Sequence, residues 1–166
     1  MASSSRNIFI TILSFILFDW ATKFAVLLGY KSCASHPKLY THNWGGVSFS
    51  IFPTFNEGAA FGFFSNYKKF LLIFRLCVIV GILAYLFFKR KSLSSLTRFA
   101  LILLCSGAIG NVGDIFFYGH VIDFLAFSYR SFAFPTFNFS DVFISLGTLL
   151  LVYKLYFPKK QKTNSI

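Results

Sequence analysis

Residues 99–117 read FALILLCSGAIGNVGDIFF and contain one charged side chain, Asp114. An apolar run of this length is close to the about 20 residues that an α-helix needs to cross the hydrocarbon core of a bilayer. Three further apolar runs occupy residues 8–28, 70–88 and 142–157. The sequence therefore predicts an all-α membrane protein whose four transmembrane helices are formed by these runs.

The overall composition supports a lipid environment. The 166 residues are 56% hydrophobic and have a mean hydropathy of +0.68, far from the usage of ordinary soluble domains. Lys and Arg number 16 against 5 Asp and Glu. These positive charges lie between and beyond the apolar runs, where they flank membrane segments, so membrane lipids are predicted as partners and nucleic acid is not.

The remaining segments predict a single membrane domain over residues 1–166. Residues 30–69 are too long and too mixed for a simple turn, and the alternating run at 47–52 follows Gly45-Gly46. Alternation of this kind predicts a small β element, which we expect to be extracytoplasmic. The polar residues 158–166 are expected to form a cytoplasmic tail.

The distribution of basic residues predicts the orientation in the membrane. Arg6, the basic loop at 89–98 and the basic tail at 159–162 all fall on one side of the predicted bundle. Short cytoplasmic loops are enriched in Lys and Arg, so both termini are expected to be cytoplasmic. The basic residues on the opposite side are spread over longer loops.

Ionisable residues in membrane segments are candidates for function. Asp19 and Lys23 lie in the first run, which continues past them without a small-residue cleavage site and is therefore predicted to be a helix and not a signal peptide. Their i,i+4 spacing places them on one helical face as an ion pair. A structural role is as plausible for this pair as a functional one.

Asp123 and Asp141 form the strongest candidate site. Asp123 follows the third apolar run, Asp141 opens the fourth, and the aromatic connection at 124–135 returns the chain to the same side of the membrane. Carboxylates at neighbouring ends of antiparallel helices can share one proton, so that one activates water while the other donates a proton. The two aspartates are therefore predicted to be the catalytic pair of an aspartyl endopeptidase, and we expect the connection to lie in the membrane interface and exclude water.

Polar and small residues near these aspartates are predicted to support the site or bind substrate. Each has an ordinary structural reading as well, since Asn138 can cap the fourth helix and the glycines around 107–113 can allow close helix packing. The supporting set comprises Asn56, Gly58, Asn111, Asp114, Asn138, Asp19 and Lys23.

Five blocks in this order resemble the signal peptidase II family along nearly the whole chain. They are DWATK at 19–23, NEGAAFG at 56–62, Gly110-Asn111 with Asp114, GHVIDF at 119–124 and FPTFNFSD at 134–141. The resemblance implies that Asp123 and Asp141 match the family's catalytic aspartates and that the asparagines and Asp114 line or support the site.

The resemblance also implies an activity and a location. The family removes the signal peptide of bacterial prolipoproteins by cutting before a diacylglyceryl-modified cysteine, in the bacterial inner membrane, with the active site towards the periplasm and without a metal or cofactor. The chain departs from the family pattern at Ile115, where the family usually has Arg. Lys23 and Arg130 are the candidates to replace that basic group.

Two other classes of function fit the sequence less well. An ion or proton transporter would use the aspartates as a relay, but its charges would be spread along several helices and repeated halves. A serine–lysine peptidase would use Lys23 as base, but no serine stands in a recognisable nucleophile motif with it. No metal site is predicted, because His120 lacks ligand spacing towards the acids. The protein is expected to be a monomer.

Overall fold

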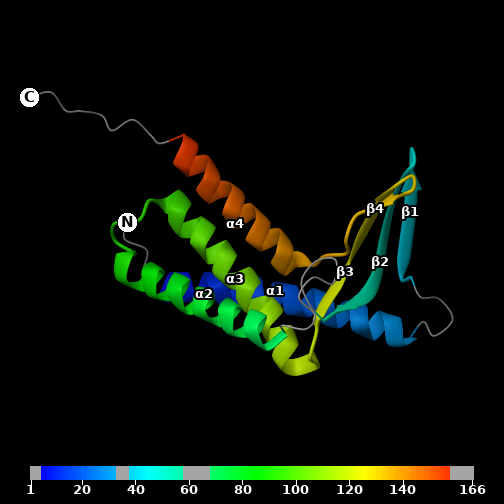
Figure 1. Cartoon of the computed structure of the whole chain (residues 1–166), viewed down its shortest axis with the longest axis horizontal. Coiled ribbons are helices and arrows are strands. Elements are labelled where there is room, and N and C mark those ends of the chain that lie inside the picture. Colours follow the sequence, from blue (N-terminus) through cyan, green and yellow to red (C-terminus); the bar gives the residue numbers. More distant parts are fainter. Residues whose placement is uncertain (1–4, 33–37, 58–67, 158–166) are drawn as a thin grey trace, which may run out of the picture.

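The computed structural model describes residues 5–32, 38–57 and 68–157, and it contains a helical bundle with a sheet at one end (Figure 1). Within the described residues the helices number four, and each is long and apolar enough to cross a membrane. They are α1 (Ser5–Ser32), α2 (Lys68–Lys89), α3 (Ser95–Tyr118) and α4 (Phe139–Tyr156). The predicted fold class, four apolar helices with a small β element, is confirmed.

Helix α3 is the centre of the bundle. It contacts α1, α2 and α4. In its most apolar 18-residue stretch 61% of the residues are buried, whereas the corresponding share in α2 is 11%. Small residues allow its close contact with α4: a Cβ on Gly147 would stand 2.7 Å from the carbonyl oxygen of Ala100. A Cβ on Gly107 would overlap the backbone carbonyl of Ser140. Packing of small residues is therefore what brings these two helices together.

The β element is a four-stranded antiparallel sheet in the order β1-β2-β3-β4. Its strands are β1 (Tyr40–Trp44), β2 (Val47–Asn56), β3 (Val121–Tyr129) and β4 (Phe132–Ala133). Gly45 and Gly46 have φ angles of +53° and +84° and make the two-residue turn between β1 and β2, which requires positive φ at both positions. The strand predicted at 47–52 is present.

The sheet is larger than the sequence predicts, because the aromatic connection at 124–135 contributes most of β3 and all of β4. Strand β3 pairs with β2 from Val47↔Tyr129 to Asn56↔Val121, with a register shift between Ile51 and Thr54. This pairing joins segments that are far apart in the sequence, and no local periodicity in either segment predicts it.

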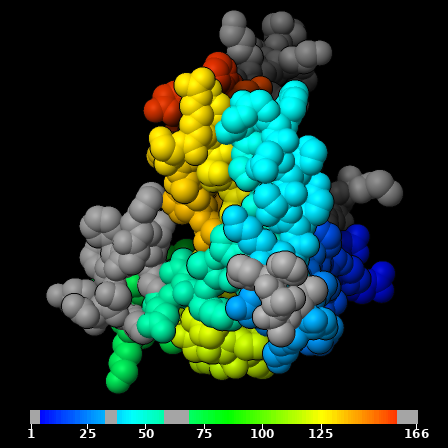
Figure 2. Space-filling view, turned by 90° about the vertical axis from the view of Figure 1, so that its right-hand side faces the viewer, coloured from blue at the N-terminus to red at the C-terminus, as the bar shows by residue number. Residues whose placement is uncertain are grey.

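The sheet is fixed to the bundle where α3 ends. Gly119 ends the helix with φ +79°, and β3 starts two residues later at Val121. Figure 1 shows the strands running across the direction of α1, and Figure 2 shows β1 and β2 in cyan and β3 in yellow across this end of the molecule. Because β3 starts beside Asn138, the residue that caps α4, Asp123 and Asp141 come to lie at the same end of the bundle.

Candidate active site

Asp123 lies on β3 with 2% of its surface exposed. Its Oδ2 accepts a hydrogen bond of 3.0 Å from Nδ2 of Asn56, and its Oδ1 accepts one of 2.8 Å from Nδ2 of Asn138. Burial raises the pKa of Asp123 to about 6; the negative charge of Asp141 acts in the same direction, and the hydrogen bonds from Asn56 and Asn138 oppose it. This carboxyl therefore takes up a proton much closer to neutral pH than an exposed aspartate does.

Asp141 lies in the first turn of α4 and is held by α3 and by the cap of its own helix. Its Oδ1 accepts a hydrogen bond of 2.8 Å from Nδ2 of Asn111, and its Oδ2 accepts one of 3.2 Å from the backbone N–H of Asn138. The backbone N–H of Asp141 donates in return to Oδ1 of Asn138 at 2.9 Å. This reciprocal capping box orients the carboxylate through the backbone.

Asn138 joins the two acids. Its side chain is fully buried, its carbonyl oxygen accepts from the backbone of Asp141, and its amide group donates to Asp123. The same amide also contacts Oδ1 of Asn111 at 3.0 Å and the carbonyl oxygen of Ile122 at 3.2 Å. The helix cap predicted at Asn138 is present, and the capping residue also binds the second carboxylate.

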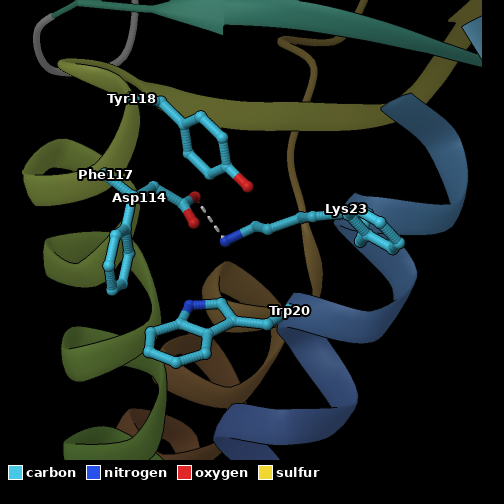
Figure 3. Close-up of a pocket in the computed structure, with 6 residues that line it drawn as sticks. Trp20, Lys23, Asp114, Phe117 and Tyr118 are labelled. Carbon is cyan, nitrogen blue, oxygen red and sulfur yellow. Dashed lines mark ion pairs between the residues drawn. The ribbon is translucent and has the colours of Figure 1, made fainter. Parts of the chain in front are cut away.

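Lys23 lies behind these amides in a buried ion-pair cluster. Its Nζ is 2.6 Å from Oδ2 of Asp19 and 2.7 Å from Oδ2 of Asp114, and only 2% of the lysine side chain is exposed. Figure 3 shows Lys23 reaching from α1 to Asp114 on α3. Nζ also donates to Oδ1 of Asn111 at 3.4 Å. The predicted Asp19–Lys23 pair is therefore present, and it includes a second acid and an asparagine that binds Asp141.

The two acids of this cluster also bind backbone amides. Oδ1 of Asp19 accepts from the N–H of Ser140 at 2.9 Å, and Oδ2 of Asp114 accepts from the N–H of Ile122 at 3.2 Å. Ser140 and Ile122 directly precede Asp141 and Asp123 in the sequence. The cluster therefore fixes the backbone on which each aspartate of the pair is carried.

A cavity of about 300 Å³ is lined in part by the Lys23–Asp114 ion pair (Figure 3). Its remaining lining residues are aromatic: Trp20, Phe24, Phe117 and Tyr118. The indole N–H of Trp20 donates to the carbonyl oxygen of Gly110 at 3.3 Å. Asp123 and Asp141 do not line this cavity.

All but one of the residues predicted to form the site lie in this network. The exception is Gly58, which lies outside the described residues. The backbone amides of Ser140 and Ile122 were missed by the sequence analysis, and no sequence signal was available for them because every residue except proline carries the same N–H group.

Ile115, which stands where the family usually has Arg, lies in the last turn of α3. Its carbonyl oxygen accepts from Gly119 at the end of α3. Arg130 follows Asp123 by seven residues along β3 and its turn, which corresponds to roughly 23 Å of extended chain. Of the two candidate replacements for the family's arginine, Lys23 is the one that reaches the block containing Asp114.

This arrangement suits acid–base hydrolysis. Asp123 is buried and Asp141 is half-buried, and Asn138 donates to both carboxylates, through its side chain to Asp123 and through its backbone N–H to Asp141. Two carboxylates held together in this way can divide the tasks of base and acid. In a bundle of apolar helices, such a pair provides the groups that an aspartyl-type membrane peptidase requires.

The comparisons with known proteins agree with this class. A family model described as signal peptidase (SPase) II matches residues 11–157. The chain belongs to the signal peptidase II family. It is 64% identical over 163 residues to a lipoprotein signal peptidase of Chlamydia pneumoniae, covering 97% of each chain. It is 53% identical over 166 residues to that of Chlamydia trachomatis serovar D, covering 98% of each.

Two solved structures share the fold. Both are described as bacterial membrane enzymes, and they superpose with TM-scores of 0.74 and 0.70 at 22% and 23% sequence identity. The alignments cover 99% and 96% of this chain and 96% and 97% of the respective structures. The arrangement of helices and sheet is therefore that of known membrane enzymes.

Proposed function

We propose that this protein removes the signal peptide of bacterial prolipoproteins by cutting before a diacylglyceryl-modified cysteine, with Asp123 and Asp141 as the catalytic pair. The observation that carries the proposal is the contact of Asn138 with both acids, through its amide to Asp123 and its carbonyl oxygen to the backbone of Asp141. The family and the Chlamydia relatives support the peptidase reaction, and nothing in them supports the transporter alternative.

The reaction follows from two carboxyl groups that hold one proton between them. The ionised aspartate accepts a proton from water, and the water oxygen attacks the carbonyl carbon of the scissile peptide bond. The protonated aspartate hydrogen-bonds to the carbonyl oxygen as the tetrahedral intermediate forms. The aspartate that took the proton from water then donates it to the nitrogen of the leaving amine. The C–N bond breaks, which releases a carboxyl group and the new amino terminus and returns the pair to its starting state with one proton.

The supporting residues keep the two carboxyls in place during this cycle. Asn56 donates to Asp123 and Asn111 donates to Asp141. Nζ of Lys23 donates in turn to Oδ1 of Asn111. These hydrogen bonds form when the protein folds, so the two carboxyl groups are already oriented before substrate arrives. Little further movement of the side chains is then needed to reach the transition state. We assign Gly58 to the same site from the resemblance alone.

The proposed location is the inner membrane with the catalytic pair towards the periplasm. Ser5 begins α1 and Tyr156 ends α4 at the end of the bundle opposite the sheet. Arg90 and Lys91 lie in the loop between α2 and α3 at that same end. The enrichment of Lys and Arg in short cytoplasmic loops then assigns both termini to the cytoplasm.

The substrate assignment is tested with purified protein in lipid and two forms of one prolipoprotein. The first carries diacylglycerol on its cysteine, and the second is unmodified. We expect cleavage of the modified form alone, and mass spectrometry should locate the new amino terminus at the lipidated cysteine. Equal cleavage of both forms, or a cut elsewhere, would contradict the substrate assignment while leaving the peptidase class intact.

A further inference from the structure

The free tip of the sheet carries two tight turns side by side. Gly45-Gly46 joins β1 to β2, and Arg130-Ser131 joins β3 to β4, with Arg130 at φ +53°. The backbone N–H of Arg130 donates to the carbonyl oxygen of Gly46 at 2.9 Å. This bond makes the two turns one structural unit at the end of the sheet that is far from Asp123.

A row of apolar residues crosses all four strands next to these turns. Trp44 pairs with Val47, Val47 pairs with Tyr129, and Tyr129 pairs with Phe132. Residues directly opposite each other in antiparallel strands point to the same face. We call these four residues the tip row. Their exposed fractions are 80%, 39%, 50% and 65% for Trp44, Val47, Tyr129 and Phe132.

The tip row lies on the same face of the sheet as Asp123. Side chains alternate between faces along a strand, so Asp123, Phe127 and Tyr129 share one face of β3. Asp123 on this face reaches Asn138 at the start of α4. Because the strands run across the direction of α1, the tip extends sideways from the bundle (Figure 1). In a membrane, a tip that extends sideways from the bundle lies over the lipids that surround the helices.

The two faces of the tip differ in polarity. The face opposite the tip row carries hydroxyl groups on the central strands, including Ser48 and its partner Ser128. Beside the row, the guanidinium of Arg130 lies 5.2 Å from the centre of the Tyr129 ring. The sequence has no acidic residue in 38–56 or 124–137. Aromatic side chains next to a cation and away from acids are typical of the bilayer interface.

We propose that the tip row inserts into the headgroup region of the leaflet on the side of the catalytic pair and anchors the sheet to the bilayer. Tyr129 follows Asp123 by six residues along β3, which corresponds to roughly 20 Å. An anchor at one end of this strand fixes the depth of the aspartate at the other. The anchor itself does not depend on the proposed substrate.

Tryptophan fluorescence tests this contact directly, because the chain has only 2 tryptophans: Trp44 in the tip row and Trp20 in α1. The emission of Trp44 is obtained as the difference between the natural protein and Trp44→Phe, both reconstituted in vesicles of phosphatidylglycerol and phosphatidylethanolamine. We expect lipids brominated near the top of the acyl chain to quench this difference signal, and aqueous iodide to leave it largely unquenched.

A tryptophan on the opposite face supplies the matched control. In the Trp44→Phe protein, Asn43→Trp moves the probe by one residue and therefore to the other side of β1. Its emission should be quenched by iodide and not by the brominated lipids. If Trp44 is quenched by iodide as strongly as this control, or becomes lipid-accessible only after prolipoprotein is added, the bilayer anchor is wrong.

Discussion

At the scale of single residues, the central feature is that each aspartate of the pair is held by groups from other elements. Asp123 on β3 is bound by side chains from β2 and the α4 cap, and Asp141 on α4 is bound by a side chain from α3. Asn138 takes part in both sets of contacts. Its removal should therefore affect catalysis more than it affects the stability of the fold.

Asn138→Ala removes a helix cap and the amide that binds Asp123. Loss of the cap should lower the free energy of unfolding by about 1–2 kcal/mol. Loss of a preorganised donor at the proposed catalytic pair should lower kcat by about 100-fold. Thermal unfolding and single-turnover cleavage measure the two effects. Asn43→Ala, at an exposed position on β1, should leave both unchanged; equal small effects of the two substitutions would contradict the role of Asn138.

The pH dependence of cleavage follows from the raised pKa of Asp123. A carboxyl that donates a proton is active below its pKa, and burial moves the pKa of Asp123 to about 6. We expect kcat/KM to fall as pH rises through that region and to fall again at acid pH, where the second carboxyl becomes protonated. The two apparent pKa values belong to the coupled pair. A flat profile over the pH range in which the protein stays folded would argue against a shared proton.

How much of the site the sequence predicts depends on the kind of group involved. Asp19 and Lys23 are recognisable because charges are rare in apolar helices and the i,i+4 spacing pairs them. Asp123 and Asp141 are recognisable because they flank such helices on one side. Their shared contact with Asn138 was not predictable, because it depends on the backbone path of β3 beside the start of α4.

At the scale of the elements, α3 positions the site by its close contacts with α1 and α4. A Cβ on Gly110 would overlap the hydroxyl of Ser140 and stand 2.9 Å from Oδ2 of Asp19. These neighbours are fully buried and cannot move without disturbing the ion-pair cluster. The absence of a side chain at this position is therefore a condition for the site.

Gly110→Ala should separate α3 from its neighbours and lower both stability and activity. Overpacking of this kind typically costs about 1–3 kcal/mol. Gly81 on α2 is the matched control, since a Cβ there meets nothing within 4 Å. Gly81→Ala should be neutral or stabilise α2 by up to about 1 kcal/mol, as alanine favours helix. Equal melting temperatures for the two variants would show that the close contact at Gly110 is unimportant.

The helices were predictable to a much greater extent than the sheet. Apolar runs predict all four helices because a lipid environment requires long uninterrupted segments. The segment at 121–129 reads VIDFLAFSY, which lacks the alternation of polar and apolar residues seen in a half-exposed strand. Its first four residues are buried on both faces, and this removes the pattern by which β3 would be recognised.

At the scale of the whole molecule, the helices and the sheet define two opposite ends. Asp123 on β3 and Asp141 at the start of α4 lie at the end with the sheet, and the α2–α3 connection lies at the other end (Figure 1). The orientation we propose places the first of these ends in the periplasm.

Fusions of reporter proteins test this orientation. Green fluorescent protein attached to either terminus should fluoresce, because both termini are expected in the cytoplasm. Alkaline phosphatase inserted between Gly45 and Gly46, at the exposed turn of the sheet, should be active in the periplasm. The reverse pattern would invert the proposed topology.

The most direct test of the central claim is cleavage of a diacylglyceryl-modified prolipoprotein by the natural protein, Asp123→Asn and Asp141→Asn, each reconstituted in lipid. Circular dichroism and thermal unfolding establish that both variants are folded. We predict that each folded variant loses at least about a thousandfold in cleavage rate, as expected when one member of a catalytic unit is removed. Folded variants that cleave at the natural rate would contradict the assignment of Asp123 and Asp141 as the catalytic pair.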